Sequence, residues 1–343
     1  MATTAKEIAR VLQLSEAAVS MALNNKPGVS TETRKMIIET AQNMGYDFTR
    51  ISKTSENHSI KGNIAFIIYK KYGAVVDDTP FFNQLTESIK QTCQKLRYKL
   101  HINYLYGDLE SQTDSLSIYD GILLLATEMK KEDFGSFSKL KTPIVVLDTY
   151  LQSLDYDCVL INNFQGAYQA AMYLVEQTRT QPGYLHSSYS IGNFDERADG
   201  FFKAIRDCGM SLSNSQILAL TPSLSGAYHD MLIQLNQGVI PFCGYFADND
   251  YIAAGAMKAL HEMGYQIPED VSVVGFDNLP FSNVLVPSLT TINVPKQYMG
   301  EVSVERLVQN ISSPKKPPIK IQISTSLIKR KSVANNTRNS IVQ

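Results

Sequence analysis

The first 46 residues show the apolar spacing of three short helices, followed by a polar stretch. In the first helix, the apolar positions recur at helical intervals, at Ile8, Ala9, Val11 and Leu12. Ser15 is a typical helix N-cap, and a helical pattern continues from it to Leu23. Ser30 begins a third helix that ends near Gly45. Residues 47–61 are polar and have little to bury, which predicts a linker that folds, if at all, on binding.

From residue 62 onward, short apolar runs alternate with amphipathic stretches. The apolar runs, which we expect as strands, are Ile64–Tyr69, Leu100–Leu105, Gly121–Leu125, Ile144–Leu147 and Val271–Phe276. The amphipathic stretches, which we expect as helices, include Phe82–Leu96, Gly166–Gln177 and Ile252–Gly264. Continuous apolar strands between helices are typical of parallel sheets covered on both faces. A region of about 270 residues exceeds one ordinary domain and therefore predicts two α/β lobes.

The composition is that of a globular chain and narrows the chemistry. The 343 residues are 44% hydrophobic and 19% charged with a net charge of −1, so any nucleic-acid-binding charge must be local. The four cysteines are far apart with no CxxC pair, which favours buried thiols in a reducing compartment over a disulfide framework or a zinc site. With no signal segment and no apolar run near the roughly 18 residues that span a bilayer, we expect a cytoplasmic protein without a membrane partner.

No catalytic motif is apparent. The five histidines are dispersed and show no metal-ligand spacing, at His58, His101, His186, His229 and His261. The chain has no GxSxG, P-loop or GxGxxG motif. The sequence therefore predicts no catalytic residue, no metal site and no cofactor, and argues against an enzyme.

The pattern of the first helices alone fits either a DNA-reading helix-turn-helix or a generic three-helix bundle. The segment Thr4–Arg34 closely resembles the amino terminus of the LacI/GalR (lactose-repressor/galactose-repressor) family of transcriptional regulators. The matching residues, at fixed spacing, are Ile8-Ala9, Leu14-Ser15, Ala18-Val19-Ser20, Leu23-Asn24, Val29-Ser30, Thr33-Arg34 and Gly45-Tyr46. The resemblance implies a helix-turn-helix domain in residues 1–46 with its recognition helix in residues 15–23.

The resemblance also implies which residues contact DNA. The base-reading positions of the recognition helix fall on Glu16, Ala17 and Met21, with further DNA contacts from Thr4, Ser15, Ser20, Asn24 and Arg34. Met21 stands where the family usually has an arginine that reads guanine, and Glu16 can accept a hydrogen bond from cytosine N4 but repels phosphate. The operator is therefore expected to differ from the family's common one. Gln13 replaces a turn glycine, which predicts a slightly strained turn.

The segment 47–61 corresponds to the hinge helix of the family, which enters the minor groove and wedges a leucine between base pairs. Here Ser55 stands at the wedge position, so Arg50 and Ile51 are the candidates for a phosphate contact and a wedge. A plain flexible linker fits the segment equally well. Residues 1–60 carry seven cations and six anions, a net charge of +1, which predicts modest non-specific affinity for DNA.

The chain from residue 62 nearly to Arg330 also resembles this family and, more distantly, the periplasmic sugar-binding proteins. The most distinctive matches are Ala247-Asp-Asn-Asp250, Val274-Gly-Phe-Asp277 and Pro287-Ser-Leu-Thr-Thr-Ile292. The resemblance implies a periplasmic-binding-protein-like α/β body, 62–330, of two Rossmann-like parallel-sheet lobes. Lobe 1 is expected in about 62–160 and 292–322, and lobe 2 in about 161–291 and 323–330, with a tail at 331–343. A small-molecule effector, a sugar or a derivative, is expected between the lobes at the carboxyl ends of strands.

Eight residues are candidate effector contacts. Arg197, Asn249 and Asp277 match ligand contacts of the family, and Asp148 ends a strand where it can accept ligand hydroxyls. The aromatic candidates are Phe81, Phe82, Phe194 and Tyr69. Polar groups at strand ends can instead cap helices, and one of the two neighbouring phenylalanines can instead cap the core.

The resemblance implies a ligand-responsive repressor that binds a near-palindromic operator in double-stranded DNA as a homodimer. The alternative is a small-molecule (sugar) binding protein without a regulatory role. The sequence leaves sugars, sugar phosphates and nucleobases open as effectors.

Overall fold

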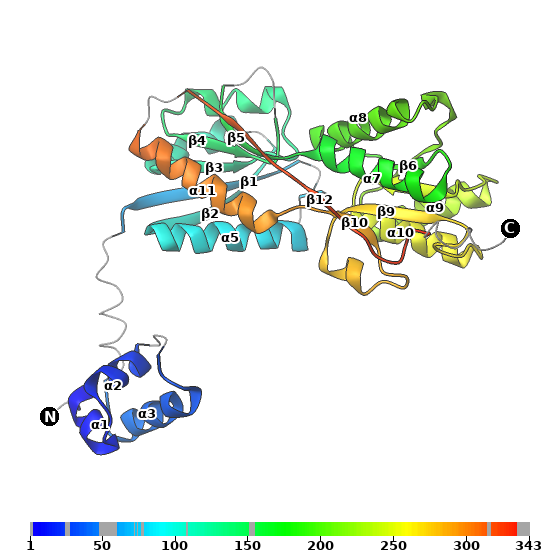
Figure 1. The fold of residues 1–343 in the computed structure, drawn as a ribbon. Coiled ribbons are helices and arrows are strands. Elements are labelled where there is room, and N and C mark those ends of the chain that lie inside the picture. Colours follow the sequence, from blue (N-terminus) through cyan, green and yellow to red (C-terminus); the bar gives the residue numbers. More distant parts are fainter. Residues whose placement is uncertain are drawn as a thin grey trace. The chain divides into compact units, whose positions relative to one another are not determined.

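The computed structural model describes residues 3–24, 28–47, 60–71, 73, 75–76, 79–107, 109–150, 155–313 and 317–334. The chain divides into two compact units, Met1–Lys61 and Gly62–Gln343. The first unit is an all-helical head, and the second is an α/β body with two lobes (Figure 1). None of the described helices has the length and hydropathy of a membrane-spanning segment.

The head consists of three capped helices, α1 (Ala5–Leu12), α2 (Glu16–Leu23) and α3 (Thr31–Asn43). Each begins after a hydroxyl residue, Thr4, Ser15 or Ser30, whose side chain accepts a hydrogen bond from a backbone N–H of the first turn. The helices enclose a small core of Ile8, Ala9, Val19, Ala22, Leu23, Ile37 and Ala41. Gln13 adopts the left-handed conformation, with φ 54°, so the strain expected in the turn before α2 is present. The three helices predicted from the sequence are confirmed.

Lobe 1 of the body is built on a six-stranded parallel sheet in the order β11-β5-β4-β3-β1-β2. Its strands are β1 (Gly62–Lys70), β2 (Tyr98–Tyr106), β3 (Gly121–Leu125), β4 (Ile144–Leu147), β5 (Asp157–Ile161) and β11 (Lys320–Ile323). Helices α5 (Pro80–Leu96) and α11 (Lys296–Ser312) cover one face. The other face is covered by α6 (Glu110–Thr113), η1 (Asp114–Ile118), η2 (Lys131–Phe134) and η3 (Phe137–Lys139).

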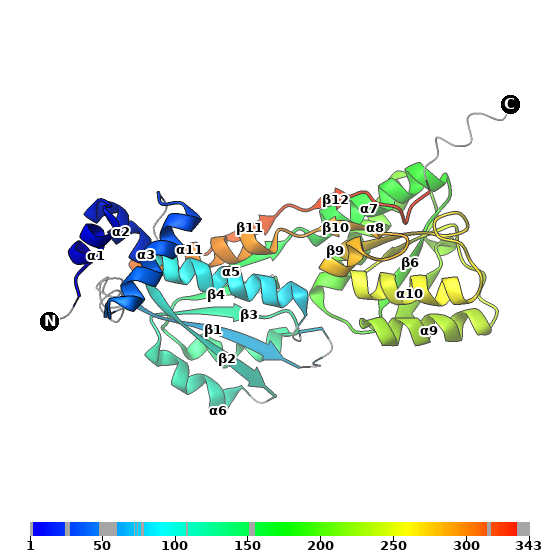
Figure 2. The same cartoon turned by 90° about the horizontal axis from the view of Figure 1, so that it is seen from below.

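Lobe 2 contains a second six-stranded sheet in the order β12-β10-β9-β8-β6-β7, parallel except for β12. Its strands are β6 (Gly183–Ser187), β7 (Ile217–Leu220), β8 (Gly244–Ala247), β9 (Ser272–Asp277), β10 (Thr290–Asn293) and β12 (Ser326–Ile328). Its α-helices are α7 (Asn163–Thr178), α8 (Gly192–Asp207), α9 (Leu224–Asn236) and α10 (Asp250–Glu262). Two short 3₁₀ helices, for which the label η is used, are η4 (Leu212–Asn214) and η5 (Pro280–Asn283). Helices α7 and α8 cover one face of the sheet, and α9 and α10 cover the other (Figure 2).

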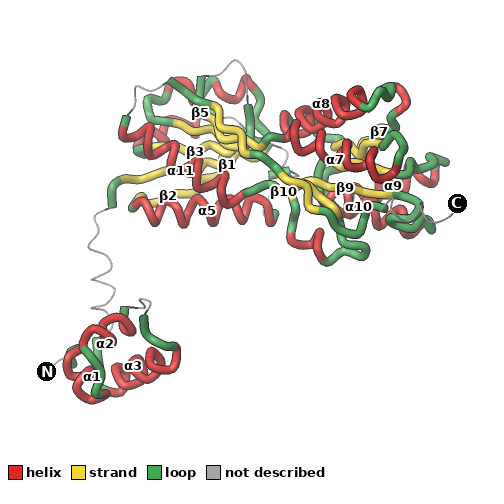
Figure 3. Tube along the Cα trace, viewed as in Figure 1, coloured by secondary structure: helices red, strands yellow, loops and turns green. Residues whose placement is uncertain are grey.

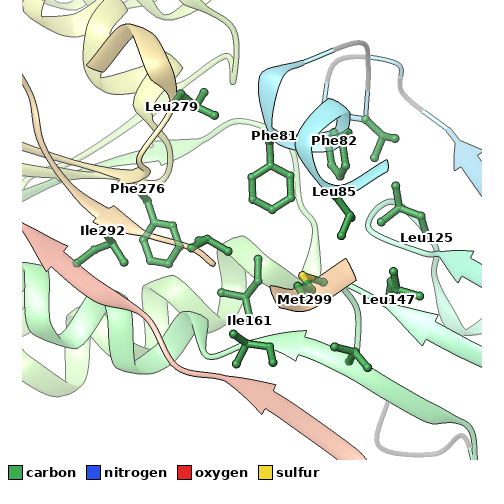
Figure 4. Close-up of a cluster of buried hydrophobic side chains, with 14 of the residues drawn as sticks. Phe81, Phe82, Leu85, Leu125, Leu147, Ile161, Phe276, Leu279, Ile292 and Met299 are labelled. Carbon is green, nitrogen blue, oxygen red and sulfur yellow. The ribbon is translucent and has the colours of Figure 1, made fainter. Parts of the chain in front are cut away.

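The two lobes of the body are joined by three crossings of the chain, after β5, after β10 and after β11 (Figure 3). A buried hydrophobic cluster continues across this junction, with Phe81 and Ile161 from lobe 1 and Phe276 and Ile292 from lobe 2 (Figure 4). This shared cluster packs the two lobes together at the junction, where the carboxyl ends of the two sheets face each other.

Two glycines in lobe 2 allow its helices to approach closely. A Cβ atom at Gly200 would lie 2.2 Å from the carbonyl oxygen of Phe164, and one at Gly255 would lie 2.6 Å from that of Leu224. Backbone atoms cannot give way as a flexible side chain can, so α8 packs on α7, and α10 on α9, only with glycine at these positions.

The last described residues differ from the expected tail. The backbone N–H of Val273 donates to the carbonyl of Ser332 at 2.8 Å, and Val333 is buried in the core. The prediction of a tail from residue 331 is therefore wrong for residues 331–334, because these residues pack along β9. Residues 335–343 lie outside the described part of the chain.

Candidate functional site

Helix α2 of the head presents one polar, solvent-exposed face. Ser15, Glu16, Ala17, Ser20 and Asn24 are all exposed. The face is nearly neutral, because the carboxylate of Glu16 lies 3.8 Å from the Lys6 ammonium. Five of the ten predicted DNA contacts therefore lie exposed along α2 and at its ends.

Several predicted DNA contacts also shape the helix ends. Thr4 forms a capping box with Glu7 at the start of α1, and the side-chain amide of Asn24 donates to the carbonyl of Ser20 at 2.8 Å. Met21 is half-buried, and a Cβ at Gly28 would lie 3.3 Å from its sulfur. The contacts predicted for Arg50 and Ile51 lie outside the described residues.

The guanidinium of Arg34 holds the carboxyl-terminal end of α2. Its Nη1 donates to the carbonyls of Ala22 at 2.9 Å and of Met21 at 3.3 Å. These carbonyls lie in the last turn, where the helix dipole favours a cation. Arg34 thus positions the helix expected to read DNA, and its own contact with DNA stays a prediction.

The body encloses a cavity of about 340 Å³ where its two lobes meet. Lobe 1 contributes Gly73, Val75, Thr79, Phe81, Phe82, Thr127, Asp148 and Ile161. Lobe 2 contributes Ile191, Asn193, Phe194, Arg197, Pro222, Ser223, Leu224, Asn249, Tyr251, Asp277 and Leu279. Several of the polar lining groups follow or end a strand at its carboxyl end, as the sequence predicted. Among the described residues, no group of histidine, cysteine or acidic side chains could hold a metal ion.

Seven of the eight predicted effector contacts line the cavity, and Tyr69 does not. Side chains alternate between the two faces of a strand, so Tyr69 points with Ile67 into the core on the opposite face of the lobe 1 sheet from α5 and α11. There it is only 2% exposed. The structure therefore does not place Tyr69 in the cavity lining, because the end of β1 alone does not determine the face to which a side chain points.

The sequence missed five polar lining residues, Thr79, Thr127, Asn193, Ser223 and Tyr251. Thr127 follows β3 at the same sheet edge as Asp148, so the rule used for Asp148 would have found it. The others lie at or near the starts of helices, and only the packing of the two lobes brings them to the cavity.

Arg197 is held by a buried network on every side of its guanidinium. Its Nε donates to Asn163 Oδ1 at 2.9 Å, its Nη1 donates to the carbonyl of Asp248, and its Nη2 lies 3.5 Å from Asp277 Oδ1. The guanidinium carbon also lies 3.7 Å from the centroid of the Phe276 ring. With the residue only 4% exposed, Arg197 forms part of the cavity wall and of the structure behind it.

Asp148 faces Arg197 from lobe 1 and has one oxygen without a partner. Its Oδ2 accepts a hydrogen bond of 2.6 Å from Thr127, and its buried Oδ1 has no hydrogen-bond partner among the described residues. Burial raises the pKa of Asp148 to about 6, against the hydrogen bond from Thr127, the Arg197 charge and the nearby Asn193 amide. A ligand that donates to Oδ1 would satisfy this carboxylate.

Asn249 combines the two roles that the sequence left open. Its Oδ1 accepts a hydrogen bond of 2.8 Å from the backbone N–H of Ile252 and so caps α10. The residue also lines the cavity, where an effector contact stays a prediction. Phe81 and Phe82 likewise both line the cavity and both belong to the core. Their rings pack edge to face, with 5.0 Å between the ring centroids.

Beside the cavity wall, His186 pairs with a buried carboxylate. Its Nδ1 lies 2.8 Å from Asp248 Oδ2, and the same carboxylate accepts hydrogen bonds from the Ser187 N–H and the Tyr184 hydroxyl. Burial opposes the imidazolium, but the contact with Asp248 and the charges of Asp248 and Asp195 outweigh it and raise the pKa of His186. The folded state therefore binds the imidazolium proton of His186 more tightly than the unfolded chain does.

We expect the stabilisation by His186 to be lost as the pH rises. It should be full below the unfolded-state value of 6.5 and disappear as the pH passes the raised folded-state pKa. His186→Gln should therefore lower the melting temperature more at about pH 6 than at about pH 8.5. His261→Gln, at an exposed position of α10, is the matched control. Equal losses at both pH values would show that His186 is not protonated preferentially in the folded state.

Comparisons with known proteins agree with this arrangement. A model of the periplasmic binding protein-like domain matches residues 171–333. The HTH-type transcriptional repressor PurR of Mannheimia succiniciproducens is 28% identical over 340 residues, which are 96% of this chain and 98% of that protein.

Two solved structures are similar over most of their length. A LacI family transcriptional regulator from Enterococcus faecium with bound ribose is 25% identical, with a TM-score of 0.67 over 80% of this chain and 99% of that one. The lac repressor dimer bound to operator and the anti-inducer ONPF has a TM-score of 0.68 over 97% of this chain and 100% of that one. At 20% identity, this last likeness shows the fold alone.

Proposed function

Since this chain belongs to the LacI/GalR family of transcriptional regulators, we propose that it represses transcription as a homodimer on a near-palindromic operator. In this proposal, a sugar or sugar-like effector in the body cavity controls DNA binding. The observation that carries the proposal is the combination, in one chain, of a helix-turn-helix head with a cavity lined from both lobes. The chain also matches a repressor along almost its whole length.

The head supplies the DNA-reading surface of this proposal. Glu16, Ala17 and Met21 are the proposed base readers, and Thr4, Ser15, Ser20 and Asn24 are proposed to contact the DNA beside them. Because a two-fold dimer presents two copies of α2, it would match two half-sites of a near-palindrome. The lac repressor, which has the same fold, is seen as a dimer bound to its operator.

The body supplies the response to the effector. A ligand between the lobes changes DNA binding only if it binds the DNA-competent and DNA-incompetent forms unequally. Phe81, Phe82 and Phe194 offer apolar walls, and Asp148, Arg197, Asn249 and Asp277 offer polar groups, a combination suited to a sugar ring. The similar regulator from Enterococcus faecium holds ribose, which supports a sugar here.

The experiment is gel retardation of the DNA upstream of the organism's own genes by the whole chain. The whole chain should retard a specific near-palindromic fragment, and a chain without residues 1–60 should not, although its body, a separate compact unit, stays folded. Retardation of the same fragment by the truncated chain would refute the proposed role of the head. Circular dichroism of the truncated chain is the control, because it shows whether retardation is lost through unfolding of the body.

A small-molecule binding protein without a regulatory role is the alternative function. It predicts ligand binding but no retardation of DNA by the whole chain. The curated relatives are transcriptional repressors, which confirms the prediction of a regulator rather than an enzyme. A regulator of transcription acts where the chromosome is, so we place this one in the cytoplasm.

A further inference from the structure

Acidic groups outnumber cations around the cavity. Two carboxylates, Asp148 and Asp277, and one cation, Arg197, line it among the described residues. Behind this lining lie two more buried acidic residues, Asp248 and Asp250, whose charges act on Asp277 or are acted on by it. An anionic ligand would therefore enter a region of like charge.

The two buried cations near the cavity already have partners. Each nitrogen of the Arg197 guanidinium contacts Asn163, Asp248 or Asp277. Lys296, which is buried beneath the cavity wall, donates to the carbonyls of Asp277 and Val294. A phosphate would have to take a cation from these partners and leave a buried carboxylate or carbonyl unsatisfied.

Two buried side-chain oxygens of the cavity lining lack a hydrogen-bond partner among the described residues: Asp148 Oδ1, which as a carboxylate oxygen only accepts, and the Thr79 hydroxyl, which can accept or donate. A ligand hydroxyl in the cavity can donate to Asp148 Oδ1. Burial already disfavours the charged form of Asp148, Asp250 and Asp277, raising the pKa of each carboxyl. A second negative charge at this place would add to that cost, whereas a hydroxyl donor would reduce it.

The size and walls of the cavity set the other limit. Its volume of about 340 Å³ is at the low end of the range of ligand pockets. Three phenylalanines, Phe81, Phe82 and Phe194, provide apolar faces on which a ring can lie.

We infer that the effector is an uncharged sugar of about monosaccharide size that donates a hydroxyl hydrogen to Oδ1 of Asp148, and that the cavity rejects its phosphorylated form. This inference rests on the proposed function, in which the cavity holds the effector. It removes sugar phosphates from the three open classes, sugars, sugar phosphates and nucleobases, and the choice of a sugar over a nucleobase follows from the proposed function.

The test is a titration calorimetry panel on the full chain with the common aldopentoses, aldohexoses and ketohexoses, their phosphate esters, and adenine and guanine. At least one neutral sugar should bind, and its phosphate ester should bind about 100-fold or more weakly, because it brings charge beside two carboxylates. An ester that binds as tightly as its sugar, binding of a nucleobase only, or no binding of any neutral sugar would each overturn the inference.

Asp148→Asn tests the role of the carboxylate in this selection. The amide has nearly the same shape but no charge, so the difference in affinity between the sugar and its ester should shrink about tenfold or more. Asp114→Asn removes the same charge at an exposed position of η1 and should leave the difference unchanged. An unchanged difference in Asp148→Asn would overturn the assignment.

Gel retardation on the same samples separates the two proposals. A chain that binds a neutral sugar as described but no DNA would refute the repressor function and leave the ligand inference standing. A chain that binds its operator but is switched by a sugar phosphate would do the reverse.

Discussion

Arg197→Ala is expected to lower the free energy of unfolding of the body by about 3–5 kcal/mol, the usual cost of removing one partner from a buried ion pair. The substitution leaves the carboxylate of Asp277, beside Asp250, with only the charge of Lys296 to offset its own, and it leaves Asn163 Oδ1 and the Asp248 carbonyl without the Arg197 donor. It also removes the guanidinium that lies on the Phe276 ring. Urea denaturation of the full chain, followed by near-ultraviolet circular dichroism, measures the loss.

The matched control for this prediction is the double variant Arg197→Ala with Asp277→Asn. If the loss comes from an uncompensated charge, removing that charge should restore part of the stability. A single variant within about 1 kcal/mol of the wild type would show that the network around Arg197 contributes little. Ligand affinity should therefore be compared only between variants shown to be folded, since Arg197 has a structural role beside its proposed contact with the effector.

The polar cavity residues that could be found from the sequence are those that end strands. Asp148, Asn249 and Asp277 each follow or end a short apolar run, and the carboxyl ends of parallel strands meet at one edge. Asn193 and Tyr251 begin helices of lobe 2 without such a marker. The structural role of Arg197 needed the tertiary fold, because its partners are 34, 51 and 80 positions away in the sequence.

A strand could be predicted from the sequence where both of its faces are buried and all of its residues are apolar. Strand β3, with the sequence GILLL, is buried at every position and is visible as an apolar run. Strand β10, with the sequence TTIN, is buried too, but its threonines are satisfied by polar partners. The hydroxyl of Thr291 donates to Asp250, and that of Thr290 accepts from the Arg330 N–H, contacts that hydropathy cannot foresee.

In the head, the helix boundaries could be predicted from caps, but the support of the recognition helix could not. Ser15 and Ser30 are local signals, since each caps the helix that starts at the next residue. Arg34 matches the family pattern and was therefore expected to contact DNA. Its hydrogen bonds to Met21 and Ala22 join two helices and depend on how α3 packs on α2.

Arg34→Ala is expected to weaken operator binding at least about tenfold, by loosening α2. The variant loses hydrogen bonds from a charged group to two carbonyls, each worth about 1.5–3 kcal/mol at good geometry. The amide hydrogens of α2 should exchange faster in the full chain, because the end of the helix is no longer held. Operator titration and hydrogen exchange measure the two effects.

The dependence of operator binding on salt distinguishes a positioning residue from a phosphate contact. If Arg34 only holds α2, the affinity of Arg34→Ala falls while the slope of log affinity against log salt stays the same. If Arg34 pairs with a phosphate, the slope should become shallower by about 0.9 per site. Lys35→Ala removes the same charge from the next, exposed position of α3 without a contact to α2, and so should leave the exchange of α2 unchanged. A shallower slope for Arg34→Ala together with unchanged hydrogen exchange in α2 would show that Arg34 contacts DNA and does not support α2. Removal of a residue that holds α2 should make the amide hydrogens of α2 exchange faster.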